Sequence, residues 1–191
     1  MSETILVTGA SAGFGQAICR RLVADGYRVI GSARRIDKLQ ALQEELGEDF
    51  YPLQMDVTDL SQVDHALASL PKDWEKVDVL VNNAGLALGL APAYEAEVAD
   101  WLTMIQTNIV GLTYLTRKIL PQMVERNDGY IINLGSTAGT VPYPGANVYG
   151  ASKAFVKQFS LNLRADLAGK KIRVSNIEPG LCEGTEFSSV R

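Results

Sequence analysis

The sequence contains little of what a disulfide framework, a metal centre or a histidine-based catalyst needs. Its 191 residues include two cysteines, Cys19 and Cys182, and a single histidine, His65. Two distant cysteines exclude a disulfide framework but leave one bridge open, and they are typical of a reducing compartment. These three residues have no metal-ligand spacing, and they form no Ser-His-Asp or Cys-His catalyst. We therefore expect no bound metal.

Long apolar runs and an excess of basic residues are also missing. The first three residues carry no basic region of the kind that opens a secretory signal, and the longest apolar run, residues 84–93, is too short to span a bilayer. The net charge of −4 offers no basic surface for nucleic acid. These features predict a cytoplasmic protein that binds neither nucleic acid nor membrane.

What the sequence does contain is short apolar, β-branched runs that alternate with longer stretches of helical period. Strands are predicted at residues 5–7, 27–33, 50–55, 77–81, 130–134 and 172–177, and helices at 13–25, 37–46, 60–70 and 148–167. Residues 95–126 are expected to form two helices, or one helix kinked at Pro121. Such alternation gives right-handed crossovers and a parallel sheet. We predict an α/β fold with a doubly wound parallel sheet of the Rossmann type, in one domain over residues 1–191.

A glycine-rich turn joins the first predicted strand to the first predicted helix. It consists of Gly9, Ala10, Ser11, Ala12, Gly13, Phe14 and Gly15. Glycines there allow the backbone to turn tightly and to approach a pyrophosphate at the helix N-terminus. Simple turn glycines are the alternative, since the spacing is G-x-x-x-G-x-G. The position between strand and helix favours a dinucleotide.

Arg34 and Arg35 follow the second predicted strand. An acidic residue at this place would hold a ribose 2′-hydroxyl, whereas arginine accommodates a 2′-phosphate. No Asp or Glu occurs in residues 26–36, and Asp37 is expected to cap the next helix. Two solvated surface arginines are the alternative, but the pattern favours NADP over NAD.

Two further predicted strands are also followed by polar or small residues. Asp56 and Val57 follow the third strand, where the carboxylate can accept a hydrogen bond from an adenine amino group. Asn83, Ala84 and Gly85 follow the fourth strand. Each group alone could be a satisfied loop. Because strand ends in a doubly wound sheet open onto one edge, we expect both groups along the path of a cofactor.

Tyr149 and Lys153 lie four residues apart in the sequence YGASK. On a helix they share one face, and an ordinary amphipathic helix would explain that equally well. A tyrosine acts as a base near pH 7 once its pKa of about 10 falls by roughly 3 units, which requires about 4 kcal/mol. A lysine ammonium about 4 Å away supplies about 4 kcal/mol at an effective dielectric constant of about 20.

Asn108 and Ser136 are two more candidates for chemistry. Asn108 is a poor helix former in an apolar helical stretch, so its side chain either bonds back to its own helix or holds a water. Ser136 follows the fifth predicted strand and thus opens onto the same edge as the other strand ends.

Together these motifs resemble the short-chain dehydrogenase/reductase family, in the family's order and over the whole chain. The residues that carry the resemblance are TGASAGFG, NNAG, Asn108, Ser136, YGASK and Pro179-Gly180. The stretches LVNNAGLALG, GSTAG, KAFVKQFSLNLR and IEPGL are similar to the members that are NADP-dependent 3-hydroxy acid dehydrogenases and also oxidise serine and allo-threonine.

The resemblance implies hydride transfer between NADP(H) and a small 3-hydroxy acid of the serine, allo-threonine or 3-hydroxypropionate type, or its 3-oxo form. Tyr149 would exchange the alcohol proton, and Ser136 would hydrogen-bond the substrate oxygen. Lys153 would hold the ribose hydroxyls, and Asn108 would position a water beside it. The implied cofactor contacts are Gly9 to Gly15, Arg34, Arg35, Asp56, Val57, Asn83, Ala84, Gly85, Tyr149, Lys153, Pro179, Gly180 and Thr185.

Two more expectations follow from the resemblance. Members assemble as homotetramers or dimers, and they continue beyond the position of Arg191 with one more strand-helix unit. We therefore expect the C-terminal part of the fold, including its last strand and helix, to be missing from this sequence.

Two other functions stay open. One is an NADPH-dependent reductase of other ketones or aldehydes, and the other is a dinucleotide sensor without turnover. Such sensors typically lose the tyrosine or the lysine, and this sequence has both. The residue that would bind a substrate carboxylate is not evident, because segments 86–92 and 137–147 contain no Lys or Arg, and Arg191 is a candidate through its position alone.

Overall fold

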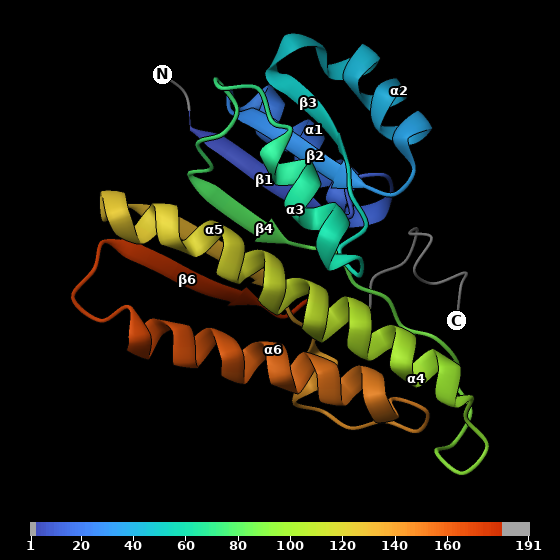
Figure 1. The fold of residues 1–191 in the computed structure, drawn as a ribbon. Coiled ribbons are helices and arrows are strands. Elements are labelled where there is room, and N and C mark those ends of the chain that lie inside the picture. The colour runs from blue at the N-terminus through green and yellow to red at the C-terminus, as the bar shows by residue number, and fades with distance from the viewer. Residues whose placement is uncertain (1–2, 181–191) are drawn as a thin grey trace.

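The structure, a computed structural model, describes residues 3–180 and has a six-stranded parallel sheet at its centre (Figure 1). The strand order is β3-β2-β1-β4-β5-β6. The strands are β1 (Thr4–Thr8), β2 (Arg28–Ala33), β3 (Phe50–Gln54), β4 (Val79–Asn82), β5 (Gly129–Leu134) and β6 (Ile172–Ile177). The order reverses between β1 and β4, and ligands bind beside such a switch point at the carboxyl ends of the strands. The predicted doubly wound parallel sheet is confirmed.

Helices cover both faces of this sheet. They are α1 (Gly13–Ala24), α2 (Ile36–Leu46), α3 (Leu60–Ala68), α4 (Val98–Ile105), α5 (Leu112–Arg126) and α6 (Asn147–Asp166), with the short turns η1 (Gly47–Asp49), η2 (Gln106–Gly111) and η3 (Thr137–Gly139). The helices α1 and α2 pack on one face, and α3, α5 and α6 pack on the other. Figure 1 shows α5 and α6 running side by side across the β5–β6 half of the sheet.

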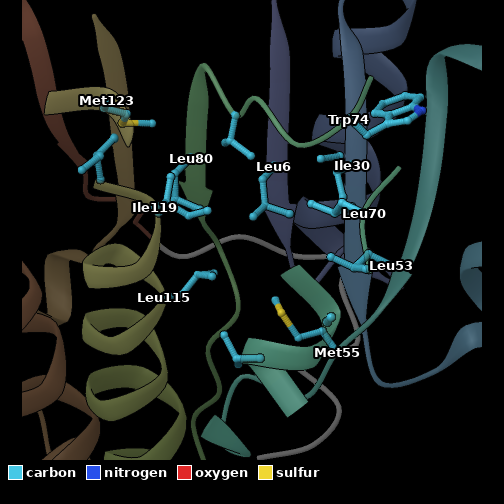
Figure 2. Packing of buried hydrophobic residues seen from close by; sticks show 14 of the residues in the cluster. Leu6, Ile30, Leu53, Met55, Leu70, Trp74, Leu80, Leu115, Ile119 and Met123 are labelled. Atoms are coloured by element: carbon cyan, nitrogen blue, oxygen red, sulfur yellow. The ribbon is translucent and has the colours of Figure 1, made fainter. Parts of the chain in front are cut away.

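The alternation of side chains along each strand explains why the strands read as continuous apolar runs. In β1, Ile5 and Val7 point into the cluster under α1 and α2, while Leu6 points into the cluster under α3 and α5. Figure 2 shows the second cluster, in which Leu6 and Leu80 of the sheet face Leu115 of α5. A strand that is covered on both faces needs apolar residues at every position.

The region predicted to be helical, residues 95–126, contains two α-helices, as one of the two alternatives predicted. The helices α4 and α5 are joined through η2 without a break, and α5 continues through Pro121 to Arg126. The irregularity is η2, a π-helical segment, and such segments often occur at functional sites. Figure 1 shows α4 and α5 as one continuous rod.

Asp37 does not cap α2 as expected. Arg35 occupies the N-cap position without a side-chain capping bond, and Asp37 lies in the first helical turn. There its carboxylate still interacts favourably with the helix dipole. The helix ends at Gly47, the C-cap residue, whose φ of 76° is a left-handed conformation that glycine adopts readily.

The described residues add three facts about the expectations drawn from composition. None of the helices in residues 3–180 is long and apolar enough to cross a membrane. The same residues contain no group of three or more His, Cys, Asp or Glu side chains that could hold a metal ion. Cys19 is buried and free, and burial raises the pKa of its thiol to about 12, which makes it unreactive near neutral pH.

Candidate active site

The glycine-rich turn folds back tightly onto the first turn of α1. Gly9 has a φ of 70°, a left-handed conformation that favours glycine. A Cβ atom at Gly15 would overlap with the carbonyl oxygen of Gly9 and would lie 2.6 Å from Nδ2 of Asn83. The N-cap residue Ala12 provides no side-chain capping bond. The N–H groups at this helix end therefore have no side-chain partner at the cap, as suits a helix that receives a phosphate.

The segment after β4 is bonded directly to the start of this turn. Asn83 donates from Nδ2 to the carbonyl oxygen of Thr8 over 2.8 Å. The backbone N–H groups of Asn83 and Ala84 both donate to Oγ1 of Thr8, at 3.0 and 2.9 Å. The Asn83 side chain is thus engaged in holding the glycine turn against β4, across the switch point of the sheet.

Arg35 reaches the glycine turn, whereas Arg34 does not make a comparable contact. The guanidinium of Arg35 donates from Nη2 and Nε to Oγ of Ser11, at 3.1 and 3.3 Å. Both arginine side chains are exposed, and the backbone carbonyl of Arg34 accepts a hydrogen bond from Gln54. Arg35 thus lies beside the turn, where a 2′-phosphate would need a positive charge.

Asp56 and Val57 lie at the carboxyl end of β3. Asp56 Oδ1 accepts from the backbone N–H and the hydroxyl of Thr58, at 2.9 and 2.7 Å. A Cβ atom at Gly111 of η2 would lie 2.7 Å from the carbonyl oxygen of Val57. The loop that is expected to flank the adenine is therefore packed directly on the π-helical segment.

Tyr149 and Lys153 share one face of α6, as the spacing predicted. They are 7% and 6% exposed, and Nζ of Lys153 lies 5.8 Å from the centroid of the Tyr149 ring. Nζ also donates to the carbonyl oxygen of Leu134, at 2.8 Å. Burial alone lowers the pKa of Lys153 to about 8. The side chain therefore carries its charge at pH 7, at a cost in desolvation that an ordinary surface lysine does not bear.

Ser136 is fixed against the same part of α6. Its Oγ accepts from the N–H of Ala138 at 3.1 Å and so caps η3. A Cβ atom at Gly139 would lie 2.7 Å from the backbone of Lys153, and one at Gly150 would lie 2.9 Å from the carbonyl oxygen of Ala138. This contact, which tolerates glycine alone, presses the Ser136 segment onto the helical turn that carries the tyrosine and the lysine.

Of the two alternatives for Asn108, the bond back to its own helix is not formed. Its side chain is 1% exposed and pairs with the backbone of Leu86, accepting at Oδ1 and donating from Nδ2, both at 2.9 Å. Nδ2 also donates to Oγ of Ser152 at 3.0 Å. A Cβ atom at Gly85 would lie 3.3 Å from both Oδ1 of Asn108 and Nζ of Lys153. Asn108, Gly85 and Lys153 thus meet at one point.

The remaining predicted residues are placed only in part. Pro179 follows β6 and accepts at its carbonyl oxygen from the N–H of Thr137, at 3.1 Å, and Gly180 comes next. Thr185 lies outside the described residues, as do Cys182 and Arg191. Sequence reasoning missed Ser152, although a buried serine inside the YGASK motif could have indicated it.

The glycine turn and Arg35 fit a dinucleotide that carries a 2′-phosphate. Comparison with known proteins identifies the family. The family described as short chain dehydrogenase matches residues 3–191. This chain belongs to the short-chain dehydrogenase family. The resemblance to this family that the sequence motifs indicated is therefore confirmed.

Several known proteins are similar to this chain over nearly its full length. A protein of Escherichia coli strain K12 named NADP-dependent 3-hydroxy acid dehydrogenase YdfG is 60% identical over 187 residues, which are 98% of this chain and 75% of that protein. Serine 3-dehydrogenase of Agrobacterium fabrum is 53% identical over 191 residues, 100% of this chain and 76% of that protein.

Solved structures extend this similarity to three dimensions. A closed form of serine dehydrogenase in complex with NADP+ has a TM-score of 0.97 at 60% identity, covering 98% of this chain and 76% of that one. An actinorhodin polyketide ketoreductase with NADPH has a TM-score of 0.92 at 36% identity, covering 100% of this chain and 74% of that one.

Proposed function

We propose that this short-chain dehydrogenase transfers a hydride between NADP(H) and a small 3-hydroxy acid, of the serine, allo-threonine or 3-hydroxypropionate type, or its 3-oxo form. The observation that carries the proposal is Lys153, a buried lysine beside Tyr149 on the face of α6 that packs against the Ser136 segment. The relatives at 53–60% identity, whose names state 3-hydroxy acid or serine dehydrogenase, support the substrate class.

Tyr149 acts as the general acid and base in this proposal. In oxidation its phenolate takes the hydroxyl proton of the substrate, and in reduction its phenol returns a proton to the carbonyl oxygen. The ammonium of Lys153 favours the phenolate because an opposite charge nearby stabilises the ionised form. Since burial lowers the pKa of Lys153 to about 8, this support is present at pH 7 and weakens above pH 8.

Ser136 and Asn108 complete the proposed catalytic set. Ser136 donates its hydroxyl proton to the substrate oxygen and orients it towards Tyr149. The amide of Asn108 holds the chain after β4 in place beside Lys153 and positions a water there. Both roles require fixed side chains, and the bonds to Ala138 and Leu86 supply that rigidity.

NADP(H), when bound, supplies or accepts the hydride. The residues proposed to hold it are Gly9, Ala10, Ser11, Ala12, Gly13, Phe14, Gly15, Arg34, Arg35, Asp56, Val57, Asn83, Ala84, Gly85, Tyr149, Lys153, Pro179, Gly180 and Thr185. The glycine turn with the uncapped start of α1 takes the phosphates, and Arg35 beside Ser11 takes the 2′-phosphate.

One observation favours a second candidate, a reductase of other ketones or aldehydes. A 3-hydroxy acid needs a positive charge for its carboxylate, yet the described loops 86–92 and 137–147 contain no Lys or Arg. A neutral carbonyl compound would not need one. The two candidates therefore differ in the charge that the substrate carries beside the reacting carbon.

The test is an NADPH oxidation assay with a matched panel of 3-oxo acids, their neutral esters, and unrelated ketones and aldehydes, together with NADP+ reduction by serine and allo-threonine. We expect the acids to give at least about tenfold higher kcat/KM than their esters, since an ion pair to a carboxylate contributes about 1.5–3 kcal/mol. Higher activity with the esters would favour the second candidate, and no turnover of any compound would contradict both.

We further propose a homotetramer or dimer that works in the cytoplasm, in line with the family and with the low cysteine content. Support for assembly comes from exposed apolar side chains on α4, where Val98 and Leu102 are 61% and 62% exposed. Light scattering on the purified protein tests the assembly, because a monomer at micromolar concentration would contradict it.

A further inference from the structure

Ser152 lies between three parts of the candidate site. Its side chain is 1% exposed, and its Oγ accepts from Nδ2 of Asn108 at 3.0 Å and donates to the backbone carbonyl oxygen of Tyr149 at 2.7 Å. Asn108 is at the same time paired with the backbone of Leu86. One hydroxyl group therefore joins the π-helical segment η2, the chain after β4, and the turn of α6 that carries the proposed base.

A second serine on α6 has nearly the same surroundings but a different set of partners. Ser160 is also 1% exposed, accepts from Nδ2 of Asn133 at 2.9 Å and donates to the carbonyl oxygen of Val156 at 2.7 Å. Asn133 in turn accepts from Asn82. This network joins α6 to the interior of the sheet and touches none of the proposed catalytic side chains.

Comparing Ser152 with Ser160 separates the contribution of any buried serine to stability from a role at the candidate site. Each hydroxyl satisfies an amide N–H that has no access to water, and losing either one leaves a buried donor without its partner. Both serines should therefore contribute similarly to stability. Only the Ser152 hydroxyl ends on Asn108 and on the Tyr149 backbone, so only its loss can shift those residues relative to Lys153.

We propose that Ser152 is a positioning residue for the reaction: its hydroxyl locks the amide of Asn108 to the helical turn of Tyr149 and thereby fixes where the Lys153 ammonium stands. The inference rests on the proposed function for its kinetic part. Because residue 85 is glycine, Asn108 Oδ1 and Lys153 Nζ border the same small space, each 3.3 Å from the position that a Cβ atom would take. Ser152 directly precedes Lys153 and bonds both Asn108 and the Tyr149 carbonyl oxygen, so its loss loosens the helical turn from which the ammonium projects.

Charged groups other than Lys153 are few on the elements that pack around this turn. Asp100 on α4 lines a pocket with Asn147 at the start of α6, and Lys157 lies one turn beyond Lys153, bound to Thr140 and Glu178. Neither Asp100 nor Lys157 contacts Ser152, so replacing the serine alters the surroundings of Tyr149 through the position of Lys153 and not through a new charge.

The experiment compares Ser152→Ala with the matched control Ser160→Ala in the full-length protein, and includes Ser152→Thr, which keeps a hydroxyl. We expect the two alanine variants to lose similar amounts of thermal stability. Only Ser152→Ala should also lower kcat, by about tenfold, the effect of one buried hydrogen bond. Ser152→Thr should recover most of that loss, because threonine can donate and accept in the same way.

A second measurement needs no substrate. Titration of the phenolate absorbance, taken as the difference between each protein and the same protein carrying Tyr149→Phe, isolates the Tyr149 phenol. We expect Ser152→Ala to raise its apparent pKa by about half a unit or more, because the ammonium no longer stands in its place. Ser160→Ala should leave the titration unchanged.

The outcomes are distinct. Equal kcat and equal Tyr149 titration in the two alanine variants would overturn the proposal and leave Ser152 a structural residue. A threonine variant of normal stability that stays as slow as the alanine variant would overturn it as well. If Ser152→Ala does not fold, Ser152→Cys takes its place, with a weaker donor and a smaller shift in the same direction. If the wild-type protein turns over no substrate, the proposed function fails, while the titration still decides the role of Ser152.

Discussion

The two sides of the candidate site, the nucleotide side and the catalytic side, are built from different materials. On the nucleotide side, the chain between β1 and α1 makes its site from backbone shape, with Gly9 in a left-handed conformation and Gly15 without room for a side chain. On the proposed catalytic side, the site consists of polar side chains that are almost completely buried, among them Asn108, Ser152 and Lys153. A substitution on the nucleotide side therefore acts mainly through steric overlap, whereas a substitution on the catalytic side acts mainly through electrostatics and lost hydrogen bonds.

The difference has consequences for stability. A tight glycine turn costs conformational entropy, but it leaves no charge in a poor solvent. The buried ammonium of Lys153 has one carbonyl bond, to Leu134, and its lowered pKa shows that the desolvation is not fully compensated. The catalytic side is thus expected to be destabilising in itself, and the nucleotide side merely intolerant of change.

Tyr149→Phe should have the largest effect on activity. The change keeps the buried ring and removes the proton donor, so kcat should fall at least about 100-fold while NADPH affinity is largely kept. Steady-state kinetics and NADPH fluorescence titration measure the two quantities. Tyr114→Phe is the control, because its hydroxyl bonds Asp64 on the surface, far from the site chemistry. Turnover within a few-fold of wild type would mean that YGASK is only a helix face.

Lys153→Met should abolish or strongly reduce turnover and yet stabilise the fold. Unfolding returns the lysine to water, where its pKa is 10.5 instead of about 8. The unfolded state binds the proton more tightly, so wild-type stability rises as pH increases from 8 to 10.5, and below pH 8 the full cost of about 3 kcal/mol is present. The methionine variant should therefore melt higher at pH 7, with a flatter profile between pH 8 and 10.5.

Lys118→Met provides the matched control for this stability measurement. That lysine is part-exposed and paired with Asp64, which raises its pKa instead of lowering it. Its removal should not stabilise the protein at pH 7. Equal melting temperatures of Lys153→Met and wild type at pH 7 and pH 10 would show that the buried ammonium is well compensated, and the contrast between the two sides would disappear.

The same contrast explains how much could be predicted from the sequence. The strand at residues 172–177 and the glycine turn were predicted from local patterns, because a short β-branched run and a cluster of glycines can both be recognised within a few neighbouring residues. The π-helical segment was not predicted, and Pro121, where a kink was one of two alternatives, lies inside the uninterrupted helix α5. Proline acts on its own turn, whereas η2 is held by bonds from Asn108 to Leu86 and Ser152, which are 22 and 44 residues away.

Gly15→Ala should disturb the nucleotide side by crowding alone. The backbone of Gly15 is not left-handed, but a Cβ atom there would overlap with the carbonyl oxygen of Gly9. We expect NADPH affinity to fall about tenfold or more, with about 1–3 kcal/mol lost in stability, because overpacking forces the turn apart. Gly47→Ala is the control. Gly47 has a φ of 76°, which strains any other residue, but a Cβ atom there would meet no neighbour, so stability should fall while NADPH affinity is unchanged. Equal NADPH affinity in both variants would contradict a phosphate turn at Gly9–Gly15.

The smallest effect is expected on cofactor preference, and it should distinguish the contributions of Arg35 and Arg34 within the nucleotide side. Arg35 donates to Ser11 of the glycine turn, whereas the Arg34 side chain is exposed beyond it. One charge-assisted bond to a phosphate contributes about 1.5–3 kcal/mol, so Arg35→Ala should lower kcat/KM with NADPH about tenfold or more and leave NADH almost unchanged. Arg34→Ala should lower it less, and Arg21→Ala on the outer face of α1, where the arginine pairs with Asp25, should not change it.

Arg35→Lys sharpens the same measurement, because it keeps the charge and loses the forked geometry. A guanidinium can hold a phosphate with two parallel bonds, whereas an ammonium acts as a point charge. Arg35→Lys should therefore lie between wild type and Arg35→Ala in its ratio of kcat/KM for NADPH over NADH. If Arg34→Ala proved more damaging than Arg35→Ala, the 2′-phosphate would lie on Arg34, and the contact of Arg35 with Ser11 would only stabilise the turn. If the wild-type ratio of kcat/KM for NADPH over NADH were near one, neither arginine would recognise a 2′-phosphate. The nucleotide side would then recognise only the pyrophosphate, through the shape of its backbone.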